Sequence, residues 1–185
     1  HFIFNSLNSI QGFISTNDPF QAKRYLAKFA RLMRLILENA REEYIPLENE
    51  LDILRNYMEL EKLSTKNKFE FAINLSDEVD PDNTEIPPMM IQPFVENAII
   101  HGIKKKEGDG QIDLNFHLNQ NVIVCEIVDN GIGRKASQES KTHVKKKHKS
   151  AGISVTKQRL EQLSIQTGHD ISVQFIDLME NEQAL

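Results

Sequence analysis

Apolar residues in the first third of the chain recur at alternating steps of four and three, which is the spacing of an amphipathic helix. The first stripe consists of Ile3, Leu7, Ile10 and Ile14. A polar run at residues 15–17 interrupts it, and Asp18 followed by Pro19 then predicts a second helix start, with the aspartate as N-cap. The second stripe consists of Ala22, Leu26, Phe29, Met33 and Ile36. We therefore predict two helices joined by a short loop.

The apolar face of the second helix is wide, because further large side chains flank its stripe, namely Tyr25, Leu32, Leu35 and Leu37. One partner helix cannot cover a face of this width. Either the rest of the chain or a second copy of the hairpin could cover it. We favour a second copy, which would complete a dimeric four-helix bundle.

The remainder of the chain alternates between helical and extended patterns. Pro46 fixes a third helix start, and Glu48 and Glu50 suit the positive end of that helix. Helices are expected over residues 47–63, 88–101 and 151–167, and strands over residues 69–75, 112–118, 122–128 and 171–176. The predicted class is therefore α+β, with a helical hairpin ahead of a mixed unit of helices and strands.

Composition excludes several classes of protein. The 185 residues are 39% apolar and 26% charged, which is typical of a folded chain, and no apolar run is long enough to span a bilayer. The net charge of -5 argues against binding nucleic acid over the whole surface. The single cysteine, Cys125, excludes an internal disulfide and has the setting of a buried strand residue. The first residue is His1 rather than methionine, so we expect further sequence to precede it.

Two helical segments carry chemical signals, and each has an ordinary structural alternative. His1 begins the first helix, where its imidazole could act as a nucleophile or could be a surface residue. Asn5 lies one turn on and could orient the ring. Asn97 and His101 are four residues apart on one helix face, where an amide oxygen can ligate Mg²⁺ and an imidazole can contact a phosphate. They are equally readable as a buried polar pair.

Two glycine-containing segments carry further signals. Asp129 follows an expected strand, and a carboxylate there can accept a hydrogen bond from an exocyclic amine such as that of adenine. Gly131 and Gly133 would let the backbone approach a ligand closely, although an Asp-Asn-Gly turn is also ordinary loop chemistry. Ser150 and Gly152 open the last expected helix, whose start can bind an anion or can be a simple cap.

A lysine-rich stretch, residues 134–149, separates these two segments and has almost no apolar content. Three interpretations of it stay open: a nucleotide lid whose lysines approach phosphates, a solvated loop, and a patch that binds nucleic acid. The absence of aromatic residues among the lysines weakens the last of these.

Taken in order, the segments resemble a sensor histidine kinase, and the residues themselves resemble the LytS-type family over nearly the whole chain. The resemblance lies in a phosphoacceptor motif at residues 1–10, an asparagine box at residues 88–102, and glycine boxes at residues 129–133 and at Gly152 with Arg159 and Leu160. The family implies a dimerisation and phosphotransfer hairpin, here residues 1–65. It also implies an ATP-binding α/β sandwich of the gyrase–chaperone–kinase–MutL type, here residues 66–185 and lacking its last strand.

The resemblance implies roles for the residues on the phosphate side. His1 would be the phosphoacceptor, Asn97 the Mg²⁺ ligand and His101 a phosphate contact. Many histidine kinases carry an acid directly after the phosphoacceptor, but Phe2 stands there, which leaves the catalytic base unassigned. Glu96 is the candidate base, with a structural carboxylate as the alternative.

The resemblance also implies the rest of the nucleotide pocket. Asp129 would bind the adenine amine, Gly131 and Gly133 would shape the pocket, and Gly152 would lie near the phosphates. The second glycine box departs from the family pattern, because Ser150 stands where the family often has glycine. Ser150 can still donate a hydrogen bond to a phosphate.

The activity implied by the family is autophosphorylation on His1 with ATP and Mg²⁺, followed by transfer to an aspartate of a response-regulator receiver domain. The family also implies a homodimer on the cytoplasmic side of the membrane, anchored upstream of this chain, with no nucleic acid as partner. Pro93 stands where related ATPases of the fold carry a water-activating glutamate, which favours transfer over hydrolysis. A dimeric pseudokinase that only binds nucleotide and an ATPase of the same fold stay open as alternatives.

Overall fold

The computed structural model describes residues 2–65, 69–120, 122–133, 151–168 and 171–178. Within these ranges the chain forms five α-helices and two β-sheets, so the predicted α+β class is confirmed. The helices are α1 (Phe2–Ser15), α2 (Pro19–Asn39), α3 (Leu47–Ser64), α4 (Gln92–Asn97) and α6 (Ala151–Thr167), the last with the predicted bounds. The strands are β1 (Ile45–Pro46), β2 (Phe69–Leu75), β3 (Glu85–Ile86), β4 (Gly110–Asn119) and β5 (Val122–Asp129).

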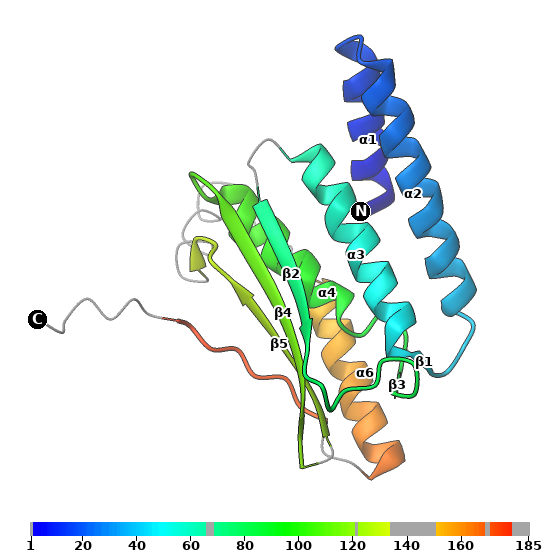
Figure 1. Cartoon of the computed structure of the whole chain (residues 1–185), viewed down its shortest axis with the longest axis vertical. Helices are drawn as coiled ribbons and strands as arrows, with labels where there is room; N and C mark the ends of the chain where they lie inside the picture. The colour runs from blue at the N-terminus through cyan, green and yellow to red at the C-terminus, as the bar shows by residue number, and fades with distance from the viewer. Residues whose placement is uncertain (1, 66–68, 121, 134–150, 169–170, 179–185) are drawn as a thin grey trace, which may run out of the picture.

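The first two helices form the predicted hairpin, which projects beyond the rest of the molecule (Figure 1). Asp18 caps α2 as expected, because its carboxylate accepts a hydrogen bond from the Gln21 N–H at 3.0 Å, and Pro19 follows in the first turn. Asn17 turns the chain between the helices with a φ of 55°. In the described part of the chain, no helix combines the length and the apolar content needed to cross a membrane.

The main sheet has three strands in the order β2–β4–β5, with β2 parallel to β4 and β4 antiparallel to β5. Alternate residues of β4 point to opposite faces, and Ile112, Leu114 and Phe116 are buried on one of them. Helices α3 and α4 pack over this face, while β1 and β3 pair in a separate ladder (Figure 1). The three strands expected between residues 69 and 128 are thus confirmed.

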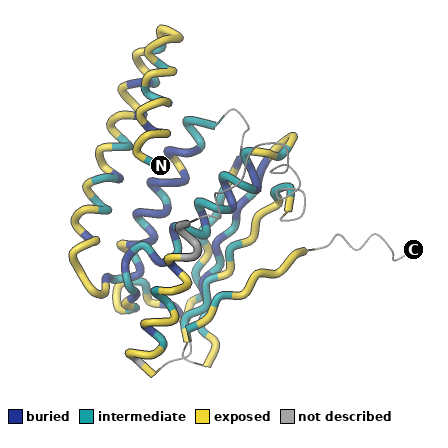
Figure 2. Tube along the Cα trace, turned by 180° about the vertical axis from the view of Figure 1, so that it is seen from behind, coloured by how far each residue is buried: buried dark blue, intermediate teal, exposed yellow. Residues whose placement is uncertain are grey.

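Helix α3 lies in the middle of the hydrophobic core, between the hairpin and the sheet (Figure 2). Its expected face of Leu51, Leu54 and Met58 is fully buried, and so are Ile53 and Tyr57 on its other sides. One cluster of apolar side chains joins α2, α3, α4, β2 and β4. The domain division expected after residue 65 stays a prediction, and α3 packs with elements on both sides of it.

The helix expected over residues 88–101 begins later than predicted. Met89 has a φ of 59°, which an α-helix does not accept, so α4 begins only at Gln92. The helix then continues as a π-helical turn (Ala98–Gly102) and a 3₁₀ turn (Ile103–Lys105). The asparagine box is therefore a short α-helix with a widened last turn.

The strand expected over residues 171–176 is wrong, because residues 171–178 belong to neither of the described sheets. The Phe175 ring lies 6.2 Å from the Phe94 ring of α4 and 4.7 Å from the Lys157 ammonium of α6. The segment thus places the Phe175 ring against α4 and α6 and forms no strand pairing within the described residues.

The end of the π-helical turn meets the loop after β5 at two glycines. A Cβ atom on Gly131 would lie 2.4 Å from the Gly102 Cα, and a Cβ atom on Gly102 would lie 2.7 Å from the Asp129 Oδ1 atom. At Gly131 the obstacle is backbone, so a side chain there would require the backbone to shift, whereas at Gly102 the nearest atom is the end of the Asp129 side chain. Glycine at position 131 is therefore what lets the two segments touch.

We predict that Gly131→Ala destabilises the protein by about 1–3 kcal/mol, because its methyl group would overlap the Gly102 backbone. Gly12→Ala, inside α1 with open space around it, is the matched control and should stabilise by about 0.5–1 kcal/mol. Urea unfolding followed by circular dichroism measures both changes. A Gly131→Ala variant as stable as the unchanged chain would contradict the close approach.

We predict that Cys125, half-buried in β5, resists alkylation in the folded protein. Burial, together with the carboxylates of Glu50 and Glu126, raises the pKa of its thiol to about 12. The thiol therefore stays protonated below that pH, and at about pH 8 only about 10⁻⁴ of it is the reactive thiolate. Mass spectrometry after iodoacetamide treatment should show modification only once urea has unfolded the chain. Rapid modification of the native protein would refute this expectation.

Candidate functional site

The helix of the asparagine box keeps two polar side chains partly accessible. Ala98 and Ile99 are buried in the core, whereas Asn97 and His101 on either side of them are half-buried. The N–H of Ile103 donates to the Ala98 carbonyl, which makes the turn that carries His101 π-helical. Such widened turns occur often at functional sites. The amide and the imidazole are thus about one helical turn apart.

Asp129 lies at the end of β5, beside the end of this turn. Its carboxylate accepts a hydrogen bond from the Gly131 N–H at 2.9 Å, and its Oδ1 atom lies against Gly102, the residue after His101. The Asp129 side chain is exposed. The structure therefore brings two segments that are far apart in the sequence into one region, and four predicted residues lie on these segments: Asn97, His101, Asp129 and Gly131.

Asn130 belongs to this region, although the sequence pattern does not single it out. Its side-chain oxygen accepts a hydrogen bond from the Gln111 N–H at 2.8 Å, and its own N–H donates to the Gln111 carbonyl at 3.2 Å. These two bonds fasten the loop to the start of β4 and so hold Asp129 in place. Asparagine before glycine is a recognised signal for bonds of this kind.

Glu50 is a second residue whose contacts the sequence pattern does not show, because the helix-end rule places it only in the first turn of α3. Its side chain is fully buried, and its carboxylate accepts hydrogen bonds from the N–H groups of Met89 at 2.8 Å and Ile91 at 3.1 Å. Burial raises the pKa of this carboxyl, while the backbone N–H groups and the Arg159 guanidinium oppose the rise. Glu50 thus holds the turn that precedes α4.

Glu96, directly before Asn97, is within electrostatic range of Glu61, a buried acid of α3. Burial raises the pKa of its carboxyl, the Glu61 carboxylate raises it further, and the Lys104 ammonium lowers it. Glu61 pairs with Lys104 at 2.5 Å. Burial raises the pKa of the Tyr57 hydroxyl well above its usual value, and the charges of Glu61 and Glu96 add to this. A carboxylate with a raised pKa is better suited to accept a proton near neutral pH.

The start of α1 lies against the same part of α3. The Phe2 ring is 5.4 Å from the Tyr57 ring. The first turn of α1 therefore lies close to Tyr57, whose pKa the charge of Glu96 helps to raise. Asn5 is exposed, and its backbone carbonyl accepts a hydrogen bond from the Ser9 hydroxyl at 3.0 Å.

The remaining predicted site residues fall in different places. His1 and Ser150 lie outside the described residues. Gly152 is in the first turn of α6, the helix that packs beside α4 (Figure 1). Gly133 follows the Asp129 loop with a φ of 77°, a conformation that favours glycine.

The polar side chains of this region suit a nucleotide and a metal ion that binds with it. An exposed carboxylate at a strand end can accept from the amine of a base, and Gly131 has no Cβ atom to obstruct the loop that carries it. The amide of Asn97 and the imidazole of His101 suit a hard cation and a phosphate. No group of three or more His, Cys, Asp or Glu side chains is arranged to hold a metal ion among the residues that the structure describes.

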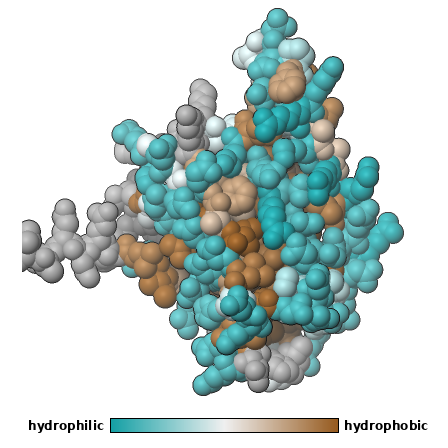
Figure 3. Space-filling model, in the orientation of Figure 1, coloured by the Kyte–Doolittle hydropathy of each residue, from teal (hydrophilic) through white to brown (hydrophobic). Residues whose placement is uncertain are grey.

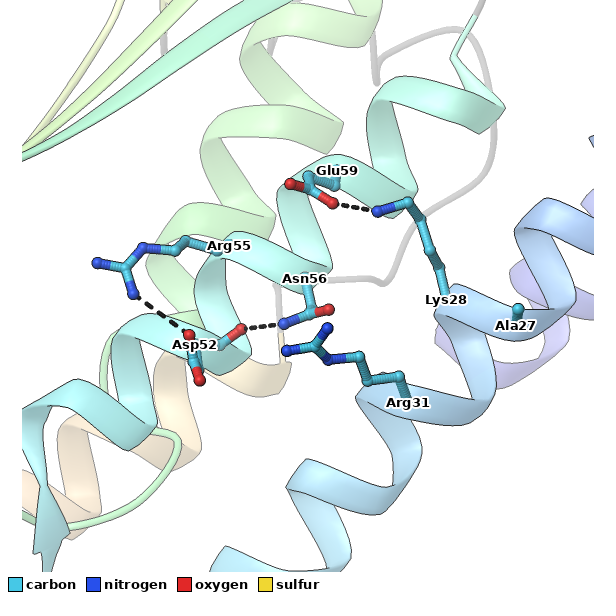
Figure 4. A pocket seen from close by; sticks show the side chains of 7 residues that line it. All are labelled: Ala27, Lys28, Arg31, Asp52, Arg55, Asn56 and Glu59. Carbon is cyan, nitrogen blue, oxygen red and sulfur yellow. Dashed lines mark hydrogen bonds and ion pairs between the residues drawn. The ribbon is translucent and has the colours of Figure 1, made fainter.

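A groove of about 340 Å³ lies elsewhere, between α2 and α3 (Figure 4). Its walls are mostly charged, with Lys28 paired to Glu59 across the two helices and Arg55 paired to Asp52 at 3.2 Å. None of the predicted site residues lines it. The groove therefore belongs to the joint between the hairpin and α3.

Comparison with known proteins independently supports the resemblance to histidine kinases. Residues 1–69 match the family described as Histidine kinase. The chain is 32% identical to Sensor protein LytS of Bacillus cereus over 133 residues, which is 72% of this chain and 22% of that protein. It is 32% identical to Sensor protein LytS of Staphylococcus epidermidis over 138 residues, which is 75% of this chain and 23% of that protein. It is also 32% identical to Sensor histidine kinase YpdA of Escherichia coli, over 72% of this chain and 23% of that protein.

The chain thus spans less than a quarter of the length of these relatives. The family match covers the hairpin and α3, and the likeness to the sensor proteins covers more of the chain than that. Both agree with the order of the motifs along the sequence. The chain therefore belongs to the histidine kinase family, in its LytS-type branch.

Proposed function

We propose that this chain is the catalytic core of a two-component sensor histidine kinase, which phosphorylates its own His1 with ATP. The observation that carries the proposal is the contact between the Asp129–Gly131 loop and the end of the asparagine box at Gly102. This contact gives one surface an acceptor for a base next to an amide and an imidazole that suit phosphates. The likeness to sensor proteins supports the same activity.

The nucleotide would bind with its adenine at Asp129, in a pocket of the gyrase–chaperone–kinase–MutL type. The exposed carboxylate accepts a hydrogen bond from the exocyclic amine, and Gly131 and Gly133 shape the loop around the base. Mg²⁺, when bound, neutralises charge on the phosphates. Asn97 holds this ion through its amide oxygen, and His101 contacts a phosphate. The N-terminus of α6, with Ser150 and Gly152, supplies further phosphate contacts.

In the proposed transfer, an imidazole nitrogen of His1 attacks the γ-phosphorus of ATP. The bond from that phosphorus to the oxygen that bridges to the β-phosphate breaks, and ADP leaves. The second ring nitrogen then gives its proton to a base. Glu96 is the proposed acceptor, because its pKa is raised and because Tyr57 connects its surroundings to the start of α1. Asn5 orients the ring.

For the transfer from ATP to His1, the hairpin unit (residues 1–65) and the ATP-binding unit (residues 66–185) have to approach one another. The phosphoryl group would next pass from His1 to an aspartate of a response-regulator receiver domain. Membrane anchoring upstream of His1, with this chain on the cytoplasmic side, belongs to the same proposal. Nucleic acid has no part in it.

We predict that ATP labelled at its γ-phosphate labels His1 in a version of the chain extended upstream. The product should be acid-labile and base-stable, because protonation of the ring makes it a good leaving group. His1→Gln should abolish labelling and leave ATP affinity unchanged, since it removes only the nucleophile. Asp129→Asn should weaken both, because an amide presents donors where the adenine amine requires an acceptor. Filter binding and titration calorimetry measure the two quantities.

Other results would assign the alternatives. Release of phosphate without labelled protein would favour an ATPase of the same fold, against which Pro93 in the first turn of α4 argues. ATP binding with neither label nor release would favour a pseudokinase scaffold. Label on serine or threonine would refute the central claim.

Dimerisation through the hairpin is the second part of the proposal. Large apolar side chains stay exposed on both of its helices: Ile3, Phe4, Leu7, Ile14, Phe20, Leu26 and Leu37. Apolar side chains are visible at the surface of the hairpin in Figure 3. Leu26 and Leu37 are eleven residues apart and therefore lie on one side of α2. A second hairpin would bury them in the four-helix bundle expected from the sequence.

We predict that Leu26→Lys dissociates this dimer, because a charge would replace an exposed apolar side chain that the second hairpin would bury. Ile165→Lys is the matched control: Ile165 is 83% exposed on α6, away from the hairpin, and its substitution should leave the dimer intact. Multi-angle light scattering at high micromolar concentration measures the mass of each variant. A monomeric unchanged chain would rule out the dimer.

A further inference from the structure

We propose that Glu50 is a positioning residue, which sets the direction of the asparagine helix and couples it to α3 and α6. Its effect on phosphoryl transfer rests on the proposed function, but the hydrogen bonds that it makes do not. The proposal concerns the turn at residues 88–92, where three elements of the fold meet.

Both oxygens of Glu50 are engaged by this turn. Oε2 accepts from the Met89 N–H at 2.8 Å and Oε1 accepts from the Ile91 N–H at 3.1 Å. The residue has no exposed surface, so these bonds form away from water. A carboxylate is costly to bury, and it is retained where several donors converge on it. A carboxylate also accepts at both oxygens, which no neutral side chain of its size does.

The turn is not part of the helix that follows it. Two prolines precede Met89, and Met89 adopts a φ of 59°, so the helix cannot extend back through the turn. Helix α4 has only six residues, and its N-cap residue, Ile91, makes no side-chain capping bond. A helix this short has no independent stability. Its direction, and with it the place of Asn97, therefore depends on the buried side chains of Val95 and Ile99 and on the contacts of the turn at its start.

Arg159 of α6 binds the same turn from another side. Its Nη1 atom donates to the Pro88 carbonyl at 2.9 Å, and its charge acts on Glu50. The turn thus lies between an acid from α3 and a cation from α6. Because α3 also packs against the hairpin, a change in the position of either helix alters the anchor of the asparagine box.

Two other acids near the start of α3 do not share this arrangement. Glu48 and Asp52 pair with Arg55 at the surface, at 2.7 Å and 3.2 Å. Glu48 is two residues from Glu50 and half-exposed, so it makes a matched control with the same chemistry.

The test compares Glu50→Gln with Glu48→Gln in the intact chain. A glutamine keeps the shape of Glu50 but turns an NH₂ group toward one of the two N–H donors, so one bond is lost and the other is no longer charge-assisted. Hydrogen exchange followed by NMR should show the amides of Met89 and Ile91 exchanging about tenfold faster in Glu50→Gln and unchanged in Glu48→Gln. No nucleotide is needed for this measurement.

The second measurement is the affinity for ATP with and without Mg²⁺. Glu50→Gln should lower the affinity for ATP with Mg²⁺ about tenfold and lower the metal-free affinity less, because Asn97 moves while Asp129 stays in place. A loss of stability alone would lower both equally. Arg159→Met removes the second contact without touching a fully buried group, and it should change exchange and affinity in the same directions. If Glu50→Gln does not fold, Arg159→Met still tests the proposal.

The two proposals fail separately. Exchange rates and Mg²⁺-dependent affinity that match the unchanged chain in both Glu50→Gln and Arg159→Met would overturn the role of Glu50. If the unchanged chain binds no ATP, the proposed function fails, while faster exchange at Met89 and Ile91 still supports Glu50 as the anchor of the turn.

Discussion

The rest of the structure depends on the burial of α3 on nearly all sides. The sheet needs a cover for its apolar face, and the hairpin needs a surface on which to pack. A single helix meets both needs, which is why Ile53 and Tyr57 are as buried as Leu51 and Leu54. By the area rule, each large side chain moved out of water contributes about 1.5–3 kcal/mol. The hairpin and the nucleotide region thus share one hydrophobic core.

Placing one helix at the centre also brings polar groups into the interior. Glu50 is satisfied by backbone N–H groups and Glu61 by Lys104. Each of these acids therefore ties α3 to the segment that holds the asparagine box, one before α4 and one after the π-helical turn. Polar groups buried in this way cost stability unless they are paired, so they specify one arrangement of the helix over others.

Most of the regular elements could be predicted from spacing and from helix start and stop signals, because α1, α2, α3 and the three long strands each carry apolar side chains at a regular interval, and Gly168 ends α6. Residues 171–176 could not, since apolar alternation does not say whether a strand has a partner. The late start of α4 follows from the backbone of Met89, which no periodicity reports. The site shows the same division. Motif order placed Asp129 and Asn97 in one function, but only coordinates show Gly102 against Gly131 and Glu50 beneath the turn.

The parallel pairing of β2 with β4 has a consequence for the order of folding. The β4–β5 pair and the α1–α2 hairpin join neighbouring segments, and such contacts form quickly. Strand β2 instead pairs with residues such as Asn115, to whose side chain Asn74 donates at 2.8 Å across 41 positions of sequence. The asparagine box lies within the loop that this pairing closes, and closing a long loop costs entropy before any contact rewards it. We therefore expect the strand that ends at Asp129 to form before the pairing that brings the asparagine box beside it.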